Sequence, residues 1–484
     1  MRTTTSRHKD KAPLYEAVAG KISYLIEEGT FRPGDRLPSL RGLSSQLRVS
    51  INTVMEAYGL LEGRRLIEAR PQSGYYVCAR VPEIVATPLK SRPKIIPAKA
   101  TVSDLSQQVI VNTLNPDLLH FGCALPNPAL LPVEKLNRML ATQSRRFSYQ
   151  SVCYQMTPGN ERLRGQIARR GLIGGITVRP DEVLITSGCV EAVLLALRAV
   201  CRQGDVIAVE SPIYYLFLQL TAELGLKVLE IPATPREGIS IEALRYAIEH
   251  NRVKACLLVP NFSNPLGSLM PDERKKALVE LLASHEIPLI EDDIYGDLSF
   301  SNERPVAAKS FDRKGLVIYC SSFTKTLAPG YRVGWAIGGR FQAEMERLKT
   351  MMSIATASPP QLAVAEFLAN GGYDHHLRSI RRAYARQMAL MADSVAKYFP
   401  PGTKVTRPVG GFILWVEMPA GTDAIELYHR ALEQGISIAP GPIFSLANSY
   451  GNNIRLNAAF WDASVERGIR ILGELAGKCL ATGI

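Results

Sequence analysis

The residue types best suited to covalent chemistry occur in one short segment, CSSFTKTLAPGYRVGW, at residues 320–335. Lys325 follows an apolar run that predicts a buried strand, and an amine in that position can be held against a bound aldehyde. Ser322, Thr324 and Arg332 are close enough in the chain to gather around a phosphate, to which hydroxyl and guanidinium groups donate hydrogen bonds. A basic loop after a strand has the same pattern, so the other segments decide between the two interpretations.

A second segment, LIEDDIYGDL, ends another apolar run with acidic residues, and Tyr295 follows Asp292 by three positions. Together with the lysine segment, this pair resembles the fold-type I pyridoxal-phosphate enzymes, in which the lysine forms an internal Schiff base, or aldimine. The resemblance implies that Lys325 carries the cofactor, Asp292 contacts its pyridine nitrogen and Tyr295 its ring oxygen, as the catalytic residues. An aspartate there keeps the pyridine protonated, which makes the ring an electron sink. The adjacent Asp293 breaks the D-x-x-Y register and is the less favoured partner.

Two further segments match the same family in the same order. PNFSNPLG supplies Asn264, expected to donate to the ring oxygen, and ESPIYY supplies Tyr214, a flat apolar surface on which the ring can stack. In this family Ser322 and Arg332 bind the cofactor phosphate, with Thr324 beside them. The predicted cofactor is therefore pyridoxal 5′-phosphate.

A turn of small residues lies between the apolar run 183–186 and an apolar helix, and consists of Ser187, Gly188 and Cys189. Backbone N–H groups at a helix N-terminus can approach a phosphate closely in such a turn. Many relatives have threonine or alanine at the position of Cys189. Because a thiol is a poor donor, we expect the backbone to make the phosphate contact there.

Two more residues extend the resemblance to a partner subunit and to a ligand. Tyr154 lies five residues before Gly159 and matches a tyrosine that reaches the phosphate of the neighbouring subunit's cofactor, which implies a homodimer with shared sites. Arg455, in NNIRLNAAF, matches the arginine that binds an amino acid's α-carboxylate in two-point contact. By itself, an arginine on a strand fits a surface ion pair equally well. Together with the segments that carry Lys325 and Asp292, Arg455 predicts an amine or amino-acid effector.

These residues need a scaffold that brings distant segments together. Beyond about residue 115, short apolar runs alternate with helical patterns, which implies a largely parallel sheet covered on both faces. The runs lie at 183–186, 206–210, 255–259, 288–291 and 317–320. The predicted body is an α/β fold-type I aminotransferase-like domain, with a mostly parallel large domain and a smaller α/β domain at the C-terminal end.

Residues 14–77 predict a different, α+β fold. Ser39 and Ser50 stand where they can cap two short helices separated by a few residues, which is a helix-turn-helix spacing. Two β-like runs flank the turn PQSG at residues 71–74 and predict a small hairpin, or wing. The first segment is therefore predicted to be a winged helix-turn-helix.

The same stretch resembles the GntR family of winged-helix repressors, which implies binding to double-stranded operator DNA. Helix N-termini and a forked cation suit phosphates, the start of the second helix suits base edges in the major groove, and the wing suits a minor groove. The residues expected at the DNA are Ser39, Arg41, Ser50, Asn52, Thr53 and Gly74. Ile51 stands where many family members carry an arginine, and Gly42 where an acidic residue is common, so the operator cannot be inherited from relatives.

The bulk composition agrees with a basic, intracellular regulator. The formal net charge is +12, and residues 1–80 hold 13 Lys or Arg against 8 Asp or Glu, an excess that favours a polyanionic partner. Eight cysteines without a CxxC pair indicate thiols in a reducing compartment and argue against a metal site. The N-terminus does not fit a secretory signal, and no window approaches about 18 uncharged apolar residues. We expect a cytoplasmic protein with no membrane partner.

The predicted domains are a DNA-binding head at 1–80, a Pro- and Lys-rich linker at 81–114 and the aminotransferase-like body at 115–484. This order resembles the MocR subfamily of GntR-type transcription regulators and implies a dimer that senses pyridoxal phosphate, an amine or amino acid, or their adduct at Lys325. Two alternatives stay open: a working aminotransferase with an accessory head, and a regulator of vitamin B6 supply that answers to the cofactor alone. The operator, the target genes, the direction of control and the amine are not specified by the sequence.

Overall fold

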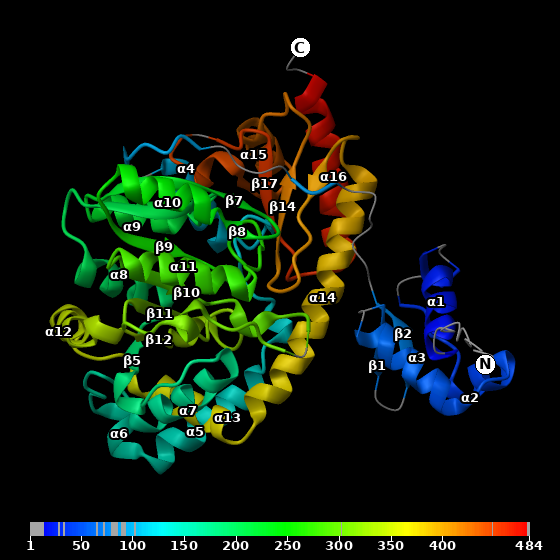
Figure 1. The fold of residues 1–484 in the computed structure, drawn as a ribbon, viewed down its shortest axis with the longest axis horizontal. Coiled ribbons are helices and arrows are strands. Elements are labelled where there is room, and N and C mark those ends of the chain that lie inside the picture. The colour runs from blue at the N-terminus through cyan, green and yellow to red at the C-terminus, as the bar shows by residue number, and fades with distance from the viewer. Residues whose placement is uncertain are drawn as a thin grey trace, which may run out of the picture. The chain divides into compact units, whose positions relative to one another are not determined.

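The computed structural model describes residues 14–27, 30–31, 34–63, 66–70, 73–78, 86–88, 93–100, 103–301, 303–447 and 449–481. The chain divides into two compact units, Met1–Val81 and Pro82–Ile484, which are described separately below (Figure 1). In the described part of the chain, no helix combines the length and the apolar composition needed to cross a bilayer.

The first unit confirms the predicted winged helix-turn-helix. Its elements are α1 (Leu14–Glu27), α2 (Leu40–Leu47), α3 (Ile51–Gly63), β1 (Ile67–Arg70) and β2 (Gly74–Val77). The two strands pair antiparallel, and Val54, Ala57 and Tyr58 of α3 are fully buried in the apolar core of this unit. The helices are short, so this packing of one apolar face supplies their stability. Pro71 and Gln72 of the predicted wing turn lie outside the described residues.

The second unit contains a large, mostly parallel sheet that confirms the predicted α/β class (Figure 1). In spatial order its strands are β3 (Ala98–Lys99), β7 (Lys227–Thr234), β6 (Val206–Ser211), β9 (Val253–Leu258), β10 (Leu289–Asp292), β11 (Val317–Ser322), β12 (Gly334–Ile337) and β5 (Leu184–Thr186), with β8 (Gly238–Ile239) paired to β7. Neighbours from β7 to β11 run parallel, whereas β3 and β12 are antiparallel to their neighbours. The parallel strands therefore end at a common edge.

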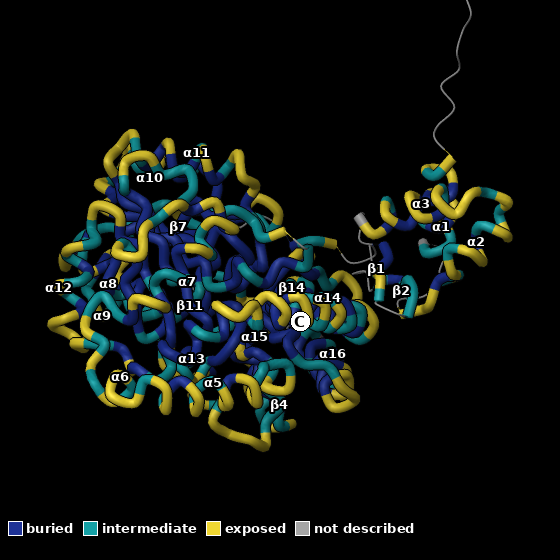
Figure 2. Tube along the Cα trace, turned by 90° about the horizontal axis from the view of Figure 1, so that it is seen from below, coloured by how far each residue is buried: buried dark blue, intermediate teal, exposed yellow. Residues whose placement is uncertain are grey.

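Helices cover both faces of this sheet. The covering helices are α8 (Cys189–Val200), α9 (Tyr215–Glu223) and α12 (Gln342–Ser353) on one face, and α10 (Ile241–His250) and α11 (Asp272–Ser284) on the other. Side chains alternate between them: Ile207 and Val209 of β6 join the first cluster and Ala208 joins the second. In Figure 2 the strands form the dark, buried interior of this unit. Burial on both faces explains why the strands are continuous apolar runs in the sequence.

Further helices and a second sheet complete the unit. The helices are α5 (Val133–Arg146), α6 (Ser148–Val152), α7 (Glu161–Gly171), α13 (Ser358–Ala369), α14 (Gly372–Tyr398), α15 (Ala424–Glu433) and α16 (Ala463–Ala481). The smaller sheet has the order β13 (Lys404–Val405), β14 (Ile413–Glu417), β17 (Asn453–Asn457) and β16 (Ala439–Pro440), and β15 (Ile436–Ser437) pairs with β4 (Leu119–His120). This is the predicted smaller α/β part at the C-terminal end, and β17 carries Arg455.

The stretch 81–114, predicted as a linker, contains secondary structure of the second unit. Strand β3 extends the large sheet by pairing with β7, and α4 (Asp104–Val111) buries Val109 and is capped by the Ser103 hydroxyl. The second compact unit begins at Pro82, ahead of the predicted boundary. The proline-rich composition of residues 81–114 did not predict β3 and α4, because a two-residue strand and an eight-residue helix leave almost no periodic pattern.

Candidate functional site

A cavity of about 190 Å³ opens at the carboxyl edge of the large sheet. Ligands of parallel α/β sheets bind at this edge, because the loops that follow the strands converge there. Eight of the residues singled out in the sequence line it: Cys189, Tyr214, Asn264, Asp292, Tyr295, Thr324, Lys325 and Arg332. Residues that span more than 140 positions of the chain therefore meet around one space.

Lys325 is the amine of this cavity. It follows β11, its Nζ donates to the backbone oxygen of Ala124 at 2.6 Å, and it lies 6.0 Å from the centre of the Tyr295 ring. Burial, assisted by the charge of Arg455, lowers the pKa of Lys325 to about 8. A larger fraction of the amine is therefore neutral near neutral pH than for an ordinary lysine, and the neutral amine is the nucleophile.

Asp292 ends β10 and faces the cavity as a buried carboxylate. Its Oδ1 accepts hydrogen bonds from the Cys189 thiol at 3.0 Å and from the Ile294 backbone N–H at 3.1 Å. Burial raises the pKa of Asp292 to about 6, with the nearby charge of Asp293 adding to the effect. A cation bound against Asp292 would stabilise the ionised form, which is the property needed opposite a protonated pyridine.

The neighbouring Asp293 has entirely different surroundings. It accepts from Arg304 at 2.5 Å, from the Tyr319 hydroxyl at 2.9 Å and from Asn261 at 2.9 Å. Arg304 also pairs with Asp297 at 2.8 Å. The Asp293 carboxylate is therefore part of this buried ion-pair network, whereas Asp292 lines the cavity.

Tyr295 and Arg455 carry buried polar atoms with no hydrogen-bond partner in the described part of the chain. These are the Tyr295 hydroxyl and the Arg455 Nε. The rest of the Arg455 guanidinium donates to Asn264 Oδ1 at 3.1 Å and to the backbone oxygen of Gly122. Leaving such groups unpaired costs about 1–3 kcal/mol each. Tyr295 lines the cavity, so a ligand bound there could satisfy its hydroxyl, whereas Arg455 is fully buried and contacts the lining residue Asn264.

The segments predicted for a phosphate meet at the mouth of the cavity. Arg332 donates to the backbone oxygen of Ser187 at 3.0 Å and to Thr324 Oγ1 at 3.4 Å, while Thr324 N–H donates to Ser322 Oγ at 3.3 Å. Gly188 has φ +88°, and a Cβ there would collide with the Arg332 guanidinium. The glycine thus lets Arg332 and the start of α8 approach each other.

Tyr214 lines the cavity and contacts other aromatic rings, with 4.8 Å between its ring centre and that of Tyr215. Tyr154 does not line the cavity and is 73% exposed. It stands among further exposed apolar side chains of the same region, Tyr149, Val152 and Met156. Within the described part of the single chain, Tyr154 is not a lining residue of this cavity.

Two contacts of the site were missed from the sequence. The loop 122–124 supplies backbone oxygens to Arg455 and Lys325, and a Cβ on Gly122 would collide with the backbone of Ile438. The thiol of Cys189, expected to be a poor donor, donates to Asp292 across 103 positions of the chain. For the loop contact, a run of small residues at 122–124 was a signal in the sequence. For the contact between Cys189 and Asp292, the sequence offered no signal.

In the head, Ser39 and Ser50 both bind the N-terminal turn of a helix. Ser39 Oγ accepts from the Gly42 N–H at 3.1 Å, and Ser50 Oγ accepts from the Thr53 N–H at 3.0 Å. Arg41 and Asn52 are exposed, and Gly74 begins β2 with φ +105°. The six predicted DNA residues thus lie at the start of α2, at the start of α3 and on the wing.

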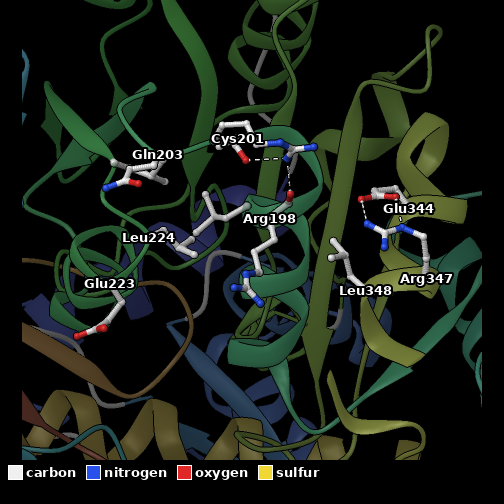
Figure 3. A pocket seen from close by; sticks show the side chains of 11 residues that line it. Arg198, Cys201, Gln203, Glu223, Leu224, Glu344, Arg347 and Leu348 are labelled. Carbon is white, nitrogen blue, oxygen red and sulfur yellow. Dashed lines mark hydrogen bonds and ion pairs between the residues drawn. The ribbon is translucent and has the colours of Figure 1, made fainter. Parts of the chain in front are cut away.

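A larger pocket of the second unit lies between α8, α9 and α12 (Figure 3), and it shares no lining residue with the Lys325 cavity. Its cavity measures about 530 Å³, and its lining includes Arg198, Glu344 and Arg347. Arg347 is already paired with Glu344 at 2.7 Å, as the dashed lines in Figure 3 show. Among the described residues, no group of three or more His, Cys, Asp or Glu could hold a metal ion. The Lys325 cavity is therefore the better candidate site.

Known proteins resemble this chain over both units. Residues 14–77 match the bacterial regulatory proteins of the gntR family, and residues 134–472 match aminotransferase class I and II. The uncharacterised HTH-type transcriptional regulators YdcR and YjiR of Escherichia coli (strain K12) are each 39% identical to the chain; the matches cover 95% and 92% of this chain and 98% and 94% of theirs.

Among solved structures, the fold is similar to LysN, the α-aminoadipate aminotransferase of Thermus thermophilus, complexed with N-(5′-phosphopyridoxyl)-L-leucine. The TM-score is 0.73 at 30% identity, and the match covers 78% of this chain and 96% of that chain. The resemblances to the two families are thus confirmed in one chain and in the predicted order. The chain belongs to the GntR-type, DNA-binding transcription regulators of MocR architecture, in which a helix-turn-helix head is fused to an aminotransferase class I and II domain.

Proposed function

We propose that the protein binds pyridoxal 5′-phosphate at Lys325 and controls transcription in response to this cofactor, to an amine or amino acid, or to both. The observation that carries the proposal is the cavity itself. A lysine with a lowered pKa, a buried carboxylate and a tyrosine hydroxyl that has no hydrogen-bond partner among the described residues face one space at the carboxyl edge of the sheet. We also propose a cytoplasmic location, because a DNA-binding regulator works on the chromosome.

The residues of the cavity fit the chemistry of this cofactor. Bound there, the cofactor would supply an aldehyde that condenses with amines and a ring that withdraws electrons. Lys325 would hold the aldehyde carbon through Nζ, and Asp292 would hold the proton of the ring nitrogen. Tyr295 would donate its unpaired hydroxyl to the ring oxygen. Ser322, Thr324, Arg332 and the turn at 187–189 would hold the phosphate by hydroxyl, guanidinium and backbone donors.

Arg455 supports an effector that carries a carboxylate. Its guanidinium is fully buried, yet its partners are neutral oxygens of Asn264 and Gly122, and its Nε has none in the described part of the chain. A buried cation without an anion is costly, so a carboxylate from the ligand would be strongly favoured. We infer that an amino acid is bound better than the corresponding simple amine.

Regulation requires the ligand to bind two arrangements of the protein with different affinities. We propose a homodimer in which the exposed apolar region around Tyr154 is covered by the second copy, so that the partner's tyrosine reaches the phosphate of each site. An effector that displaces Lys325 and engages Arg455 would act on β17 of the smaller domain. Movement of that domain is the step that would be transmitted to the DNA-binding heads.

Equilibrium binding to operator DNA tests this proposal. The affinity is measured at one fixed salt concentration for the apoprotein, the protein with pyridoxal phosphate, and the protein with cofactor and each of a panel of amino acids. We expect at least one of these additions to change the affinity or the bending of the DNA in the wild type and to have no effect in Lys325→Ala. Unchanged DNA binding under all conditions would contradict the regulatory proposal.

A working aminotransferase is the second candidate, because Lys325, Asp292 and Tyr295, the residues expected to be catalytic, all line the cavity. Conversion of an amino acid into its keto acid over many turnovers would establish that activity, and a single turnover at most would favour a sensor. A response of DNA binding to the cofactor alone, with no further effect of any amine, would identify a sensor of vitamin B6 supply.

A further inference from the structure

Helix α3 displays two large apolar side chains on its exposed face. Ile51 and Met55 are one helical turn apart and are 45% and 49% exposed, so they stand next to each other toward solvent. Asn52 and Glu56 are exposed on the adjoining strip of the same helix. The opposite face is buried in the core of the head. The apolar pair is therefore not used to hold the unit together.

This exposed face is short and carries no basic side chain. From Ile51 to Gly63 the helix contains neither Lys nor Arg. Gly59 occupies the next exposed position beyond Met55, and the space around it is open. Farther along, the exposed Glu62 accepts a hydrogen bond from the Ala69 N–H of the wing at 3.0 Å. The exposed side chains best placed for a partner are therefore those of the first two turns, Ile51, Asn52, Met55 and Glu56.

DNA is the partner that the surroundings of this face fit. The helix is the second of a helix-turn-helix, the element that enters the major groove in such units. Exposed cations flank it: Arg41 lies in the first turn of α2, and Arg48 lies in the turn that leads into α3. Phosphate contacts can come from these arginines and from the capped helix ends. Base contacts are then left to α3.

The chemistry of the four side chains selects among the bases. In the major groove guanine presents two acceptors, which are read by the paired donors of arginine or lysine, and α3 has neither. Adenine presents a donor and an acceptor, which match the amide of Asn52. Thymine presents a methyl group, which apolar side chains contact. Cytosine presents an amino donor, which matches the Glu56 carboxylate. We propose that Ile51 and Met55 recognise thymine methyl groups, and that the positions of the half-site facing Ile51, Asn52 and Met55 are A·T pairs.

This inference rests on the DNA-binding role of the protein, and it is tested with the full-length chain. Selection from random duplex DNA at one fixed salt concentration gives the preferred site. Each thymine of that site is then replaced in turn by deoxyuridine, which removes only the methyl group. At the contacted positions we expect the affinity to fall about fourfold, the effect of exposing one buried methyl group.

Variants assign the methyl groups to side chains. Ile51→Ala should abolish the effect of deoxyuridine at one position and Met55→Ala at another, as a double-mutant cycle measures. Tyr24→Ala is the matched control, because Tyr24 is 60% exposed on α1 of the same unit; it should keep both effects. Ile51→Arg should shift the selected base at its position toward guanine.

The outcomes separate this inference from the DNA-binding role itself. A selected site with A·T pairs at these positions, and with methyl sensitivity that depends on residues 51 and 55, supports it. If a specific site is selected but deoxyuridine at every thymine leaves its affinity unchanged, the inference is overturned and the DNA-binding role stands. A change of oligomeric state in Ile51→Ala would then assign the exposed face of α3 to a contact with protein. Failure to select any sequence overturns both. The wild-type measurement stands even if a variant folds poorly.

Discussion

The two units present their functional groups in opposite ways. In the body most of the groups are buried, and two polar atoms among them, the Tyr295 hydroxyl and the Arg455 Nε, have no hydrogen bond in the described part of the chain. In the head the groups are exposed, and Ser39 and Ser50 already satisfy helix ends. Burial makes electrostatic interactions strong and pKa shifts large, whereas exposed charges are screened by solvent and salt. Substitutions in the body should therefore change the affinity for one ligand strongly, whereas single substitutions in the head should change the affinity for DNA by small amounts.

The largest effect is expected for Lys325→Ala. Without the amine, no covalent attachment of pyridoxal phosphate is possible, so the yellow absorbance of the protein should be absent at every cofactor concentration. Lys314→Ala is the control, because Lys314 is exposed at a distant ion pair with Glu286. Visible absorbance that survived in Lys325→Ala and was lost on reduction would show that another amine carries the cofactor.

A large effect on ligand choice is expected for Arg455→Lys. Lysine keeps the charge but loses the planar fork, so affinity for an amino-acid effector should fall by roughly ten- to a hundredfold, the worth of charged hydrogen bonds. Affinity for the corresponding amine without a carboxylate should change little. The spectral titration of both ligands measures this difference, and an equal loss for the two would refute carboxylate binding by Arg455.

Tyr295→Phe should change stability and cofactor affinity in opposite directions. Removing a buried hydroxyl that has no partner should raise the free energy of unfolding of the apoprotein by about 1 kcal/mol. Losing the donor to the ring oxygen should weaken cofactor binding by about fivefold, from the ordinary strength of one hydrogen bond. Chemical denaturation and cofactor titration of the same samples measure the two effects. A destabilised apoprotein would mean that the hydroxyl has a structural partner.

Cys189→Ala should shift a pH dependence. Cofactor binding that relies on ionised Asp292 should weaken as the pH falls through about 6, because the protonated carboxyl no longer attracts a cation. Removing the thiol donor takes away an interaction that lowers the pKa of Asp292. The midpoint should therefore move to higher pH in Cys189→Ala and return toward the wild type in Cys189→Ser. A midpoint that does not move would exclude a contribution of the thiol.

The smallest effect is expected at the DNA, for Arg41→Ala. An exposed phosphate contact adds affinity without sequence preference, so binding to all sequences should weaken uniformly, and the slope of log affinity against log salt should fall by about 1. Salt titrations on specific and random DNA measure both quantities. A change in base preference instead would place Arg41 at base edges.

The sequence was most informative where a motif follows a buried strand. Asp292 ends an apolar strand, and Lys325 and Asn264 follow theirs within six residues, so the parallel strands that end together bring them into one cavity. The sequence gives no indication of a contact that depends on packing between distant segments. The Cys189 thiol and Asp292 are 103 positions apart, and the loop at Ala124 reaches Lys325 over 201 positions. Neither residue type nor spacing marks such contacts, and the short elements β3 and α4 were hidden for the same reason.

The central claim is that an aldehyde cofactor is attached to the amine of residue 325 in a protein that also binds DNA. Purified protein supplied with pyridoxal phosphate is treated with borohydride, digested and analysed by mass spectrometry. The account predicts a phosphopyridoxyl group on the peptide at Lys325. An unmodified peptide at this position would contradict the account, whether the protein binds the cofactor at another residue or does not bind it at all.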